Sequence, residues 1–135
     1  MEKKTTNRYI EAIGRRKTAS ARVRITESAK ESFVVNELDI TKYFDTSDLQ
    51  VIARMPFGTV GLSQKFEVSV KVQGSGTSAQ AQAVSLGVAR ALVLWDEELK
   101  KKLRSGGLLK RDSRAVERKK PGLKKARKAP TWSKR

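Results

Sequence analysis

The strongest periodicity in the chain is the strict alternation of apolar and polar residues in "KFEVSVKV". It predicts a strand with one buried and one open face, with Phe66, Val68, Val70 and Val72 on the first and Glu67, Ser69 and Lys71 on the second. The segment "RYIEAIGRRKTASARVRI" predicts two more strands around a basic turn, and in the second of them Ala19, Ala21, Val23 and Ile25 alternate with Ser20, Arg22 and Arg24. A fourth strand is expected at 33–35, followed by a turn at Asn36-Glu37 and an apolar segment that ends at Phe44.

Helical spacing of apolar residues appears in three other segments. "SDLQVIARM" predicts a short helix with Ser47 as its N-cap and Leu49, Ile52 and Ala53 on one face, and Pro56 is expected to end it. "TSAQAQAVSLGVARALVLW" predicts a long helix that opens with a capping box of Thr77 and Gln80, its apolar stripe being Val84, Val88, Ala91, Leu92 and Trp95. "DEELKKKLRSGG" predicts a short helix that Gly106-Gly107 stops.

Beyond Leu109 the apolar residues no longer recur at helix or strand spacing. Lys and Arg are frequent in this segment, which also contains Pro121 and Pro130. Such a segment buries too little surface to offset its ordering entropy. The order of elements predicts an α+β fold: a compact two-layer domain with a small mixed sheet and helices, plus an extended basic C-terminal tail. We expect residues 1–107 to form a globular α+β domain and residues 108–135 to form an extended basic tail that is disordered until it binds a partner.

Charge is distributed unevenly along the 135 residues. The net charge is +16, from 30 Lys plus Arg against 14 Asp plus Glu; residues 100–135 hold 16 basic and 2 acidic residues, which leaves 14 and 12 for residues 1–99. A surplus of this kind indicates a polyanionic partner, nucleic acid rather than an anionic membrane.

The chain contains neither cysteine nor histidine. This composition excludes disulfides and thiolate chemistry and removes the commonest acid–base group and metal ligand. The start lacks the apolar core of a signal peptide, and no run approaches the length of a membrane span. We therefore expect a cytoplasmic, non-enzymatic protein with no cofactor, no metal and no small-molecule substrate.

"GSGTSA" matches the dinucleotide-binding spacing G-x-G-x-x-A between a strand and a helix, with Asp96 20 residues beyond Gly76. That fingerprint needs its acidic residue at the end of a second parallel strand, whereas Asp96 directly follows the long helix. Two interpretations remain open. Either Gly74 and Gly76 make a tight structural turn, or the turn approaches a phosphate backbone.

Two basic segments favour contact with phosphates over an ordinary solvated surface. "GRRKTASARVR" holds five cations, and no acidic residue lies between Glu11 and Glu27 to pair with them. The last seventeen residues, "KKPGLKKARKAPTWSKR", hold eight cations and no acid, and Trp132 is an aromatic suited to stacking on bases. Upstream, Asp112 and Glu117 are expected to steady local turns by pairing with neighbouring arginines.

Three of these stretches resemble the family of the ninth small-subunit ribosomal protein in its bacterial or organellar form: "GRRKTASARV", "GSGTSAQAQAVSLGVARAL" and the final "GGLLKRDSRAVERKKPGLKKARKAPTWSKR". The chain departs from the family pattern at Ser75, Ala79, Gln82, Lys110, Ser113 and Thr131-Trp132. The resemblance implies an α+β domain on the head of the small ribosomal subunit, among neighbouring head proteins, with a tail that runs through ribosomal RNA to the anticodon stem-loop of the peptidyl-site tRNA.

The residues and the resemblance together give candidate sites. Contacts to small-subunit ribosomal RNA are expected from Arg15, Arg16, Lys17, Arg22, Arg24, Gly74, Gly76, Arg90, Lys110, Arg111, Arg114, Arg118, Lys119, Lys120, Lys124, Lys125, Arg127 and Lys128. Contacts to peptidyl-site tRNA are expected from Ser133, Lys134 and Arg135. The rival hypotheses are a general nucleic-acid chaperone, a small enzyme that uses the glycine turn on a phosphorylated ligand, and a binder of anionic membranes.

Overall fold

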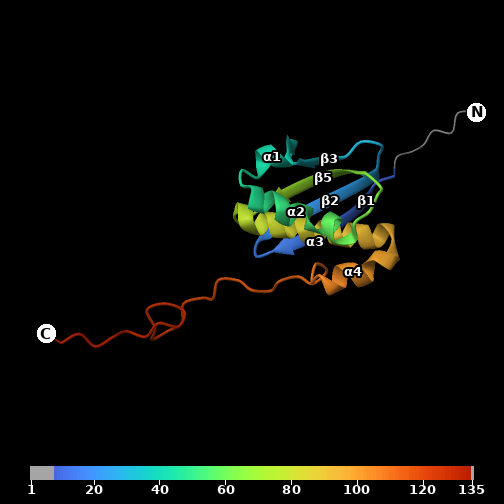
Figure 1. Ribbon diagram of the computed structural model, residues 1–135. Coiled ribbons are helices and arrows are strands. Elements are labelled where there is room, and N and C mark those ends of the chain that lie inside the picture. Colours follow the sequence, from blue (N-terminus) through green and yellow to red (C-terminus); the bar gives the residue numbers. More distant parts are fainter. Residues whose placement is uncertain (1–7, 135) are drawn as a thin grey trace, which may run out of the picture.

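A five-stranded mixed sheet carries helices against one face in the computed structural model of the protein, which describes residues 8–134 (Figure 1). The strand order is β1-β2-β5-β3-β4; β3 and β5 are parallel and the other neighbours antiparallel. Along the chain the elements are β1 (Ile10–Arg16), β2 (Ala19–Glu27), β3 (Ser32–Val35), β4 (Leu38–Asp39), α1 (Ile40–Tyr43), α2 (Ser47–Val60), β5 (Phe66–Gln73), α3 (Thr77–Trp95), the 3-10 turn η1 (Glu97–Leu99) and α4 (Lys100–Ser105). The predicted α+β class and mixed sheet are confirmed.

The predicted alternation of buried and exposed residues along two of the strands is confirmed. In β5 every second residue is buried, from Phe66 to Val72, and in β2 the buried positions run from Ala19 to Ile25. The turn between β3 and β4 uses Asn36 (φ 48°) and Glu37 (φ 69°). Two successive positive φ angles suit the right-handed twist of a tight hairpin, which confirms the turn predicted there.

Helix α2 corrects two expectations. Ser47 is its first helical residue, while Thr46 is the N-cap and makes no side-chain capping bond. Pro56 lies inside the helix, which continues to Val60 and closes at Gly61 (φ 59°). The proline removes one backbone donor, but its ring is buried, and Phe57 beside it packs between Phe33 and Phe66 at centroid distances of 6.4 and 5.9 Å. Tertiary packing therefore carries the helix past the proline.

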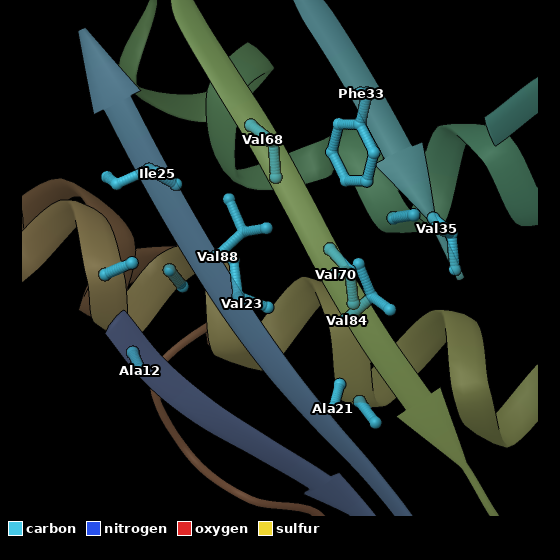
Figure 2. Close-up of a cluster of buried hydrophobic side chains, with 14 of the residues drawn as sticks. Ala12, Ala21, Val23, Ile25, Phe33, Val35, Val68, Val70, Val84 and Val88 are labelled. Carbon is cyan, nitrogen blue, oxygen red and sulfur yellow. The ribbon is translucent and has the colours of Figure 1, made fainter. Parts of the chain in front are cut away.

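Helix α3 is the centre of the core. It packs on β1 and β2 on one side and on α2 on the other, so its apolar surface is wider than the single predicted stripe. Figure 2 shows how Val84 and Val88 of α3 meet the valines of β2 and β5. The predicted capping box is wrong: Gly76 is the N-cap and no side chain caps the helix.

Strand β1 and helix α3 touch backbone to backbone. A Cβ atom built on Gly14 would lie 1.9 Å from the carbonyl oxygen of Ala83 and 2.4 Å from the amide nitrogen of Gly87. A Cβ atom on Gly87 would lie 2.6 Å from Val23 Cγ2. No side chain fits at this crossing, so both positions require glycine.

Substituting Gly14→Ala is expected to lower the free energy of unfolding by about 1–3 kcal/mol, because backbone atoms must move to admit the methyl group. Urea denaturation monitored by far-UV circular dichroism measures the change. Gly58→Ala is the matched control, since Gly58 is a helical residue of α2 with open space at its Cβ; there we expect a gain of about 0.5–1 kcal/mol. Equal effects at both positions would contradict the close crossing.

Candidate nucleic-acid interface

The face of the sheet turned away from α2 and α3 carries polar side chains. Antiparallel pairing of β2 with β5 puts Arg22 directly opposite Lys71, and both side chains are exposed. Arg15 is exposed on the same face of β1. Like charges in directly opposed positions destabilise a sheet slightly when no anion lies between them. This arrangement is suited to receiving an anion.

The expectation that no acidic residue pairs with the five cations of "GRRKTASARVR" is wrong for three of them, Arg16, Arg22 and Arg24. Glu11 lies 3.2 Å from Arg22 and 3.0 Å from Arg24, counted from carboxylate oxygen to Nε. The pairing of β1 with β2 sets Glu11 opposite Arg24, a proximity that a search along the sequence does not reveal. The Arg24 guanidinium also lies 4.4 Å from the ring centroid of Tyr9. These ion pairs are half-exposed, so they orient the arginines more than they stabilise the fold.

Arg16 does not face solvent. Strand alternation turns it toward the helices, where it is 8% exposed. Its Nε donates to Gln82 Oε1 at 2.7 Å, its Nη1 donates to the carbonyl oxygen of Arg114, and its Nη2 lies 3.6 Å from Asp112 Oδ2. Sequence reasoning assigned this guanidinium to RNA; its partners in the structure lie within the protein, and contact of Arg16 with RNA stays a prediction.

Two further cations from the predicted set contact backbone carbonyls. Arg90 Nη1 of α3 donates to the carbonyl oxygen of Ile13 at 2.9 Å. Arg111 Nη2 donates to the carbonyl oxygen of Lys17 at 3.4 Å, in the turn between β1 and β2. Both side chains thus hold segments of the fold together.

The two acids of the tail organise local turns, as predicted. Asp112 accepts hydrogen bonds from the side chain and the backbone amide of Arg114. These bonds, reinforced by the guanidinium charges of Arg114 and Arg16, hold the pKa of the Asp112 carboxyl well below its usual range. Glu117 pairs with Lys120 and with Arg127, and hydrogen bonds from Lys120 lower the pKa of Glu117 first, then those from Arg127.

The rest of the predicted cations point outward. Apart from the residues just described, the exposed predicted cations are Arg15, Lys17, Lys110, Arg118, Lys119, Lys124, Lys125, Lys128 and Lys134. Ser133 is also exposed, Trp132 is 86% exposed, and Arg135 lies outside the described residues. Figure 1 shows the tail leaving the domain beyond α4, and residues 108–134 form neither helix nor strand.

The glycine turn between β5 and α3 has a structural role. Gly74 has φ 85°, and a Cβ on it would lie 2.5 Å from the carbonyl oxygen of Thr18. Gln80 Nε2 donates to the Gly74 carbonyl at 3.1 Å, and Gln80 Oε1 accepts from the Tyr43 hydroxyl at 2.7 Å. Asn36 Nδ2 in turn donates to that hydroxyl at 3.2 Å. This chain of side chains holds the turn in place.

Gly76 differs from Gly74. It has no positive φ, and a Cβ on it would meet nothing within 4 Å. A dinucleotide site would need a further parallel strand, but after α3 the described chain contains only η1, α4 and the tail. Contact between this turn and RNA stays a prediction, and it is better placed at Gly76 than at Gly74.

Across residues 8–134, carboxylates do not gather in threes as a metal site would require. No helix in that part of the chain is both long and apolar enough to cross a membrane.

Comparison with known proteins agrees with the sequence motifs. Residues 14–135 match the family described as ribosomal protein S9/S16. The chain is 52% identical over 126 residues to small ribosomal subunit protein uS9 of Cytophaga hutchinsonii, covering 93% of this chain and 98% of that protein. It is 44% identical over 127 residues to uS9 of Porphyromonas gingivalis (94% and 98% covered) and 50% identical over 123 residues to uS9c of Spinacia oleracea (90% and 59% covered).

Fold, charge and relatives define a structural protein of the small ribosomal subunit, not an enzyme. The chain belongs to the ribosomal protein S9 family. The family membership predicted from the sequence motifs is thereby confirmed, and the hypothesis of a small enzyme is rejected.

The two glycines of the turn give a matched test of structural against binding roles. Gly74→Ala is expected to lower the free energy of unfolding by at least about 1–2 kcal/mol, because alanine disfavours the left-handed conformation and its methyl group would meet Thr18. Gly76→Ser should leave stability within about 0.5 kcal/mol of the parent, because Gly76 is the N-cap of α3, where serine is accepted at least as well as glycine, and its Cβ position is open. Chemical denaturation of both variants measures this difference, and a large loss at Gly76 would show that the turn is not as open as described.

Proposed function

We propose that this small-subunit protein binds ribosomal RNA with the open face of its sheet and with its tail, and that Ser133, Lys134 and Arg135 contact the peptidyl-site tRNA. The observation that carries the proposal is the segregation of charge. The helices cover one face of the sheet, whereas exposed cations occupy the open face and continue along the extended tail. Phosphates are the natural partners of such a surface, because each neutralised phosphate releases counterions.

On the open face, the opposed pair Arg22 and Lys71 is the best candidate for a phosphate contact. Both residues line a shallow hollow together with Ser20 and Asn36. A phosphate between the two cations would accept hydrogen bonds from both, and at Arg22 it would compete with Glu11 for the guanidinium. Lys71 was not among the cations singled out from the sequence, since only the pairing of β2 with β5 brings it to Arg22.

The tail supports contact with a backbone rather than with base edges. Its cations are spaced along an irregular segment and Lys134 is exposed near its end. Phosphate contacts carry no sequence information, so a tail of this kind can accept any tRNA. The family match supports the setting in the small subunit, and the tRNA contact rests on the resemblance and on this chemistry.

Arg22→Ala is expected to weaken binding to a small-subunit ribosomal RNA fragment and to reduce the slope of log K against log salt by about one. Filter binding over a salt series measures both quantities. Arg54→Ala is the matched control, since Arg54 is exposed on α2, in the layer opposite the open face. Equal losses from both variants, or equal affinity for any duplex, would favour a general nucleic-acid chaperone.

Deleting Lys134-Arg135 is expected to weaken peptidyl-site tRNA binding by purified small subunits while subunit assembly stays intact. Replacing both Lys124 and Lys125 with alanine removes the same charge from the middle of the tail and should leave tRNA affinity closer to the parent value. Assembly is followed by sucrose-gradient sedimentation and tRNA binding by filter retention. Failure of the deletion variant to assemble would contradict the division of labour between domain and tail.

A further inference from the structure

The contacts around Arg16 have a consequence for the tail that does not depend on what the tail binds. We propose that Arg16 is a positioning residue that clamps residues 108–114 to the domain, so that the mobile tail starts near Ala115 rather than at Leu108. The clamp consists of Arg16, Gln82 and the segment from Asp112 to Arg114.

A buried guanidinium needs partners. Arginine stays charged at any ordinary pH, and burying a charge without compensation is costly. Arg16 is 8% exposed and has one neutral acceptor in the domain, the side chain of Gln82 on α3. Its other two partners, the Asp112 carboxylate and the Arg114 carbonyl, belong to the tail. The domain therefore depends on Asp112 and Arg114 to satisfy a charge of its own.

Other contacts bind the same segment. Leu108 and Leu109 pack against the core, and the amide of Leu108 donates to the Leu103 carbonyl at 3.1 Å. Arg111 reaches the Lys17 carbonyl in the β1–β2 turn. Within the described residues 115–134 no hydrogen bond to the domain is formed: Val116 is 89% exposed, and Glu117 pairs with cations of the tail itself.

Gln82 provides the acceptor on the helix side of the clamp. Its side-chain amide oxygen accepts the hydrogen bond from Arg16 Nε at 2.7 Å. Both the helix and the tail thus hold the guanidinium in one orientation.

The clamp shortens the mobile part of the described tail from 27 residues (108–134) to 20 (115–134). Since the local concentration of a tethered tip varies roughly with the −3/2 power of tether length, this shortening raises it only about 1.6-fold. The main effect is on the direction in which the tail leaves the domain. A distance measurement is therefore a sharper test than an affinity.

The absence of cysteine allows specific spin labelling of the full-length protein. One label goes on Lys42→Cys in α1, which packs on β3 and β4 at the sheet edge opposite β1. The second goes either on Val116→Cys, just beyond the clamp, or on Thr131→Cys, near the end of the tail. Pulsed electron–electron double resonance should give a narrow distance distribution for the 42–116 pair and a broad one for the 42–131 pair.

Asp112→Asn removes the carboxylate while preserving its size. It should at least double the width of the 42–116 distribution, whereas the 42–131 distribution, which is already broad, should change much less. Glu117→Gln is the matched control, because it makes the same chemical change to an acid that contacts the tail alone. Arg16→Lys keeps the charge but loses the fork that reaches three partners, so it should broaden the 42–116 distribution as well.

The proposal is overturned if the 42–116 distribution of the parent is as broad as the 42–131 distribution, or if Asp112→Asn leaves it unchanged. It is also overturned if Glu117→Gln broadens it equally. Circular dichroism of each variant shows whether the domain remains folded. If Arg16→Lys unfolds the domain, Asp112→Asn alone decides the outcome, since its side chain lies at the surface end of the clamp.

Acid provides an independent test without mutation. The groups that face Asp112 are cationic: Arg16 from β1 and Arg114 in its own segment, with Arg15 and Lys110 lining the same hollow. Because hydrogen bonds from Arg114 lower the pKa of Asp112 below its ordinary value, the carboxylate keeps its charge as pH falls through about 4. The 42–116 distribution should stay narrow from pH 8 to about pH 4 and broaden only below that; broadening near pH 6 would contradict the clamp.

Discussion

The direct contact between the backbones of β1 and α3, at Gly14 and Gly87, is the constraint on which the rest of this structure depends. With no side chain between them, strand and helix lie close enough for neighbouring side chains to bridge the two elements. One residue before the crossing, the Ile13 carbonyl receives Arg90. Two residues after it, Arg16 reaches Gln82. A larger separation would take Arg90 out of reach of the Ile13 carbonyl and Arg16 out of reach of Gln82.

Alternation of side chains along β1 then divides one basic motif between two tasks. In "GRRK", Arg15 points to the open face and Arg16 points to the helices, although the two residues are adjacent in the sequence. The same separation holds in the tail, where some cations bind the protein's own carboxylates and carbonyls and others remain exposed. A basic residue in this chain is therefore not by itself a contact to RNA. Its role depends on which face of its element it occupies.

Much of the fold could be predicted because local patterns decide it. Period-two alternation identified β2 and β5, and the apolar spacing identified α3. The continuation of α2 through Pro56 could not be predicted, since it depends on aromatic packing against β3 and β5. The pairing of Glu11 with Arg22 and Arg24, and of Arg16 with Asp112, was missed for the same reason: strand register and chain path bring distant residues together. Sequence reasoning predicted that the candidate interface is positively charged. Deciding which cations contact the protein itself and which face solvent required the fold.

The hydrogen bonds that link the side chains of Asn36, Tyr43 and Gln80 to the backbone carbonyl of Gly74 join parts of the molecule that are remote along the chain. Asn36 also extends the sheet, since its side chain exchanges two hydrogen bonds with the backbone of Val72. The small excursion formed by β4 and α1 lies at the edge of the sheet, beside β3. Through this network, its opening would release the first turn of α3 as well. The excursion and the start of the central helix should therefore behave as one cooperative unit in native-state hydrogen exchange, with amides on both sides protected to a similar degree.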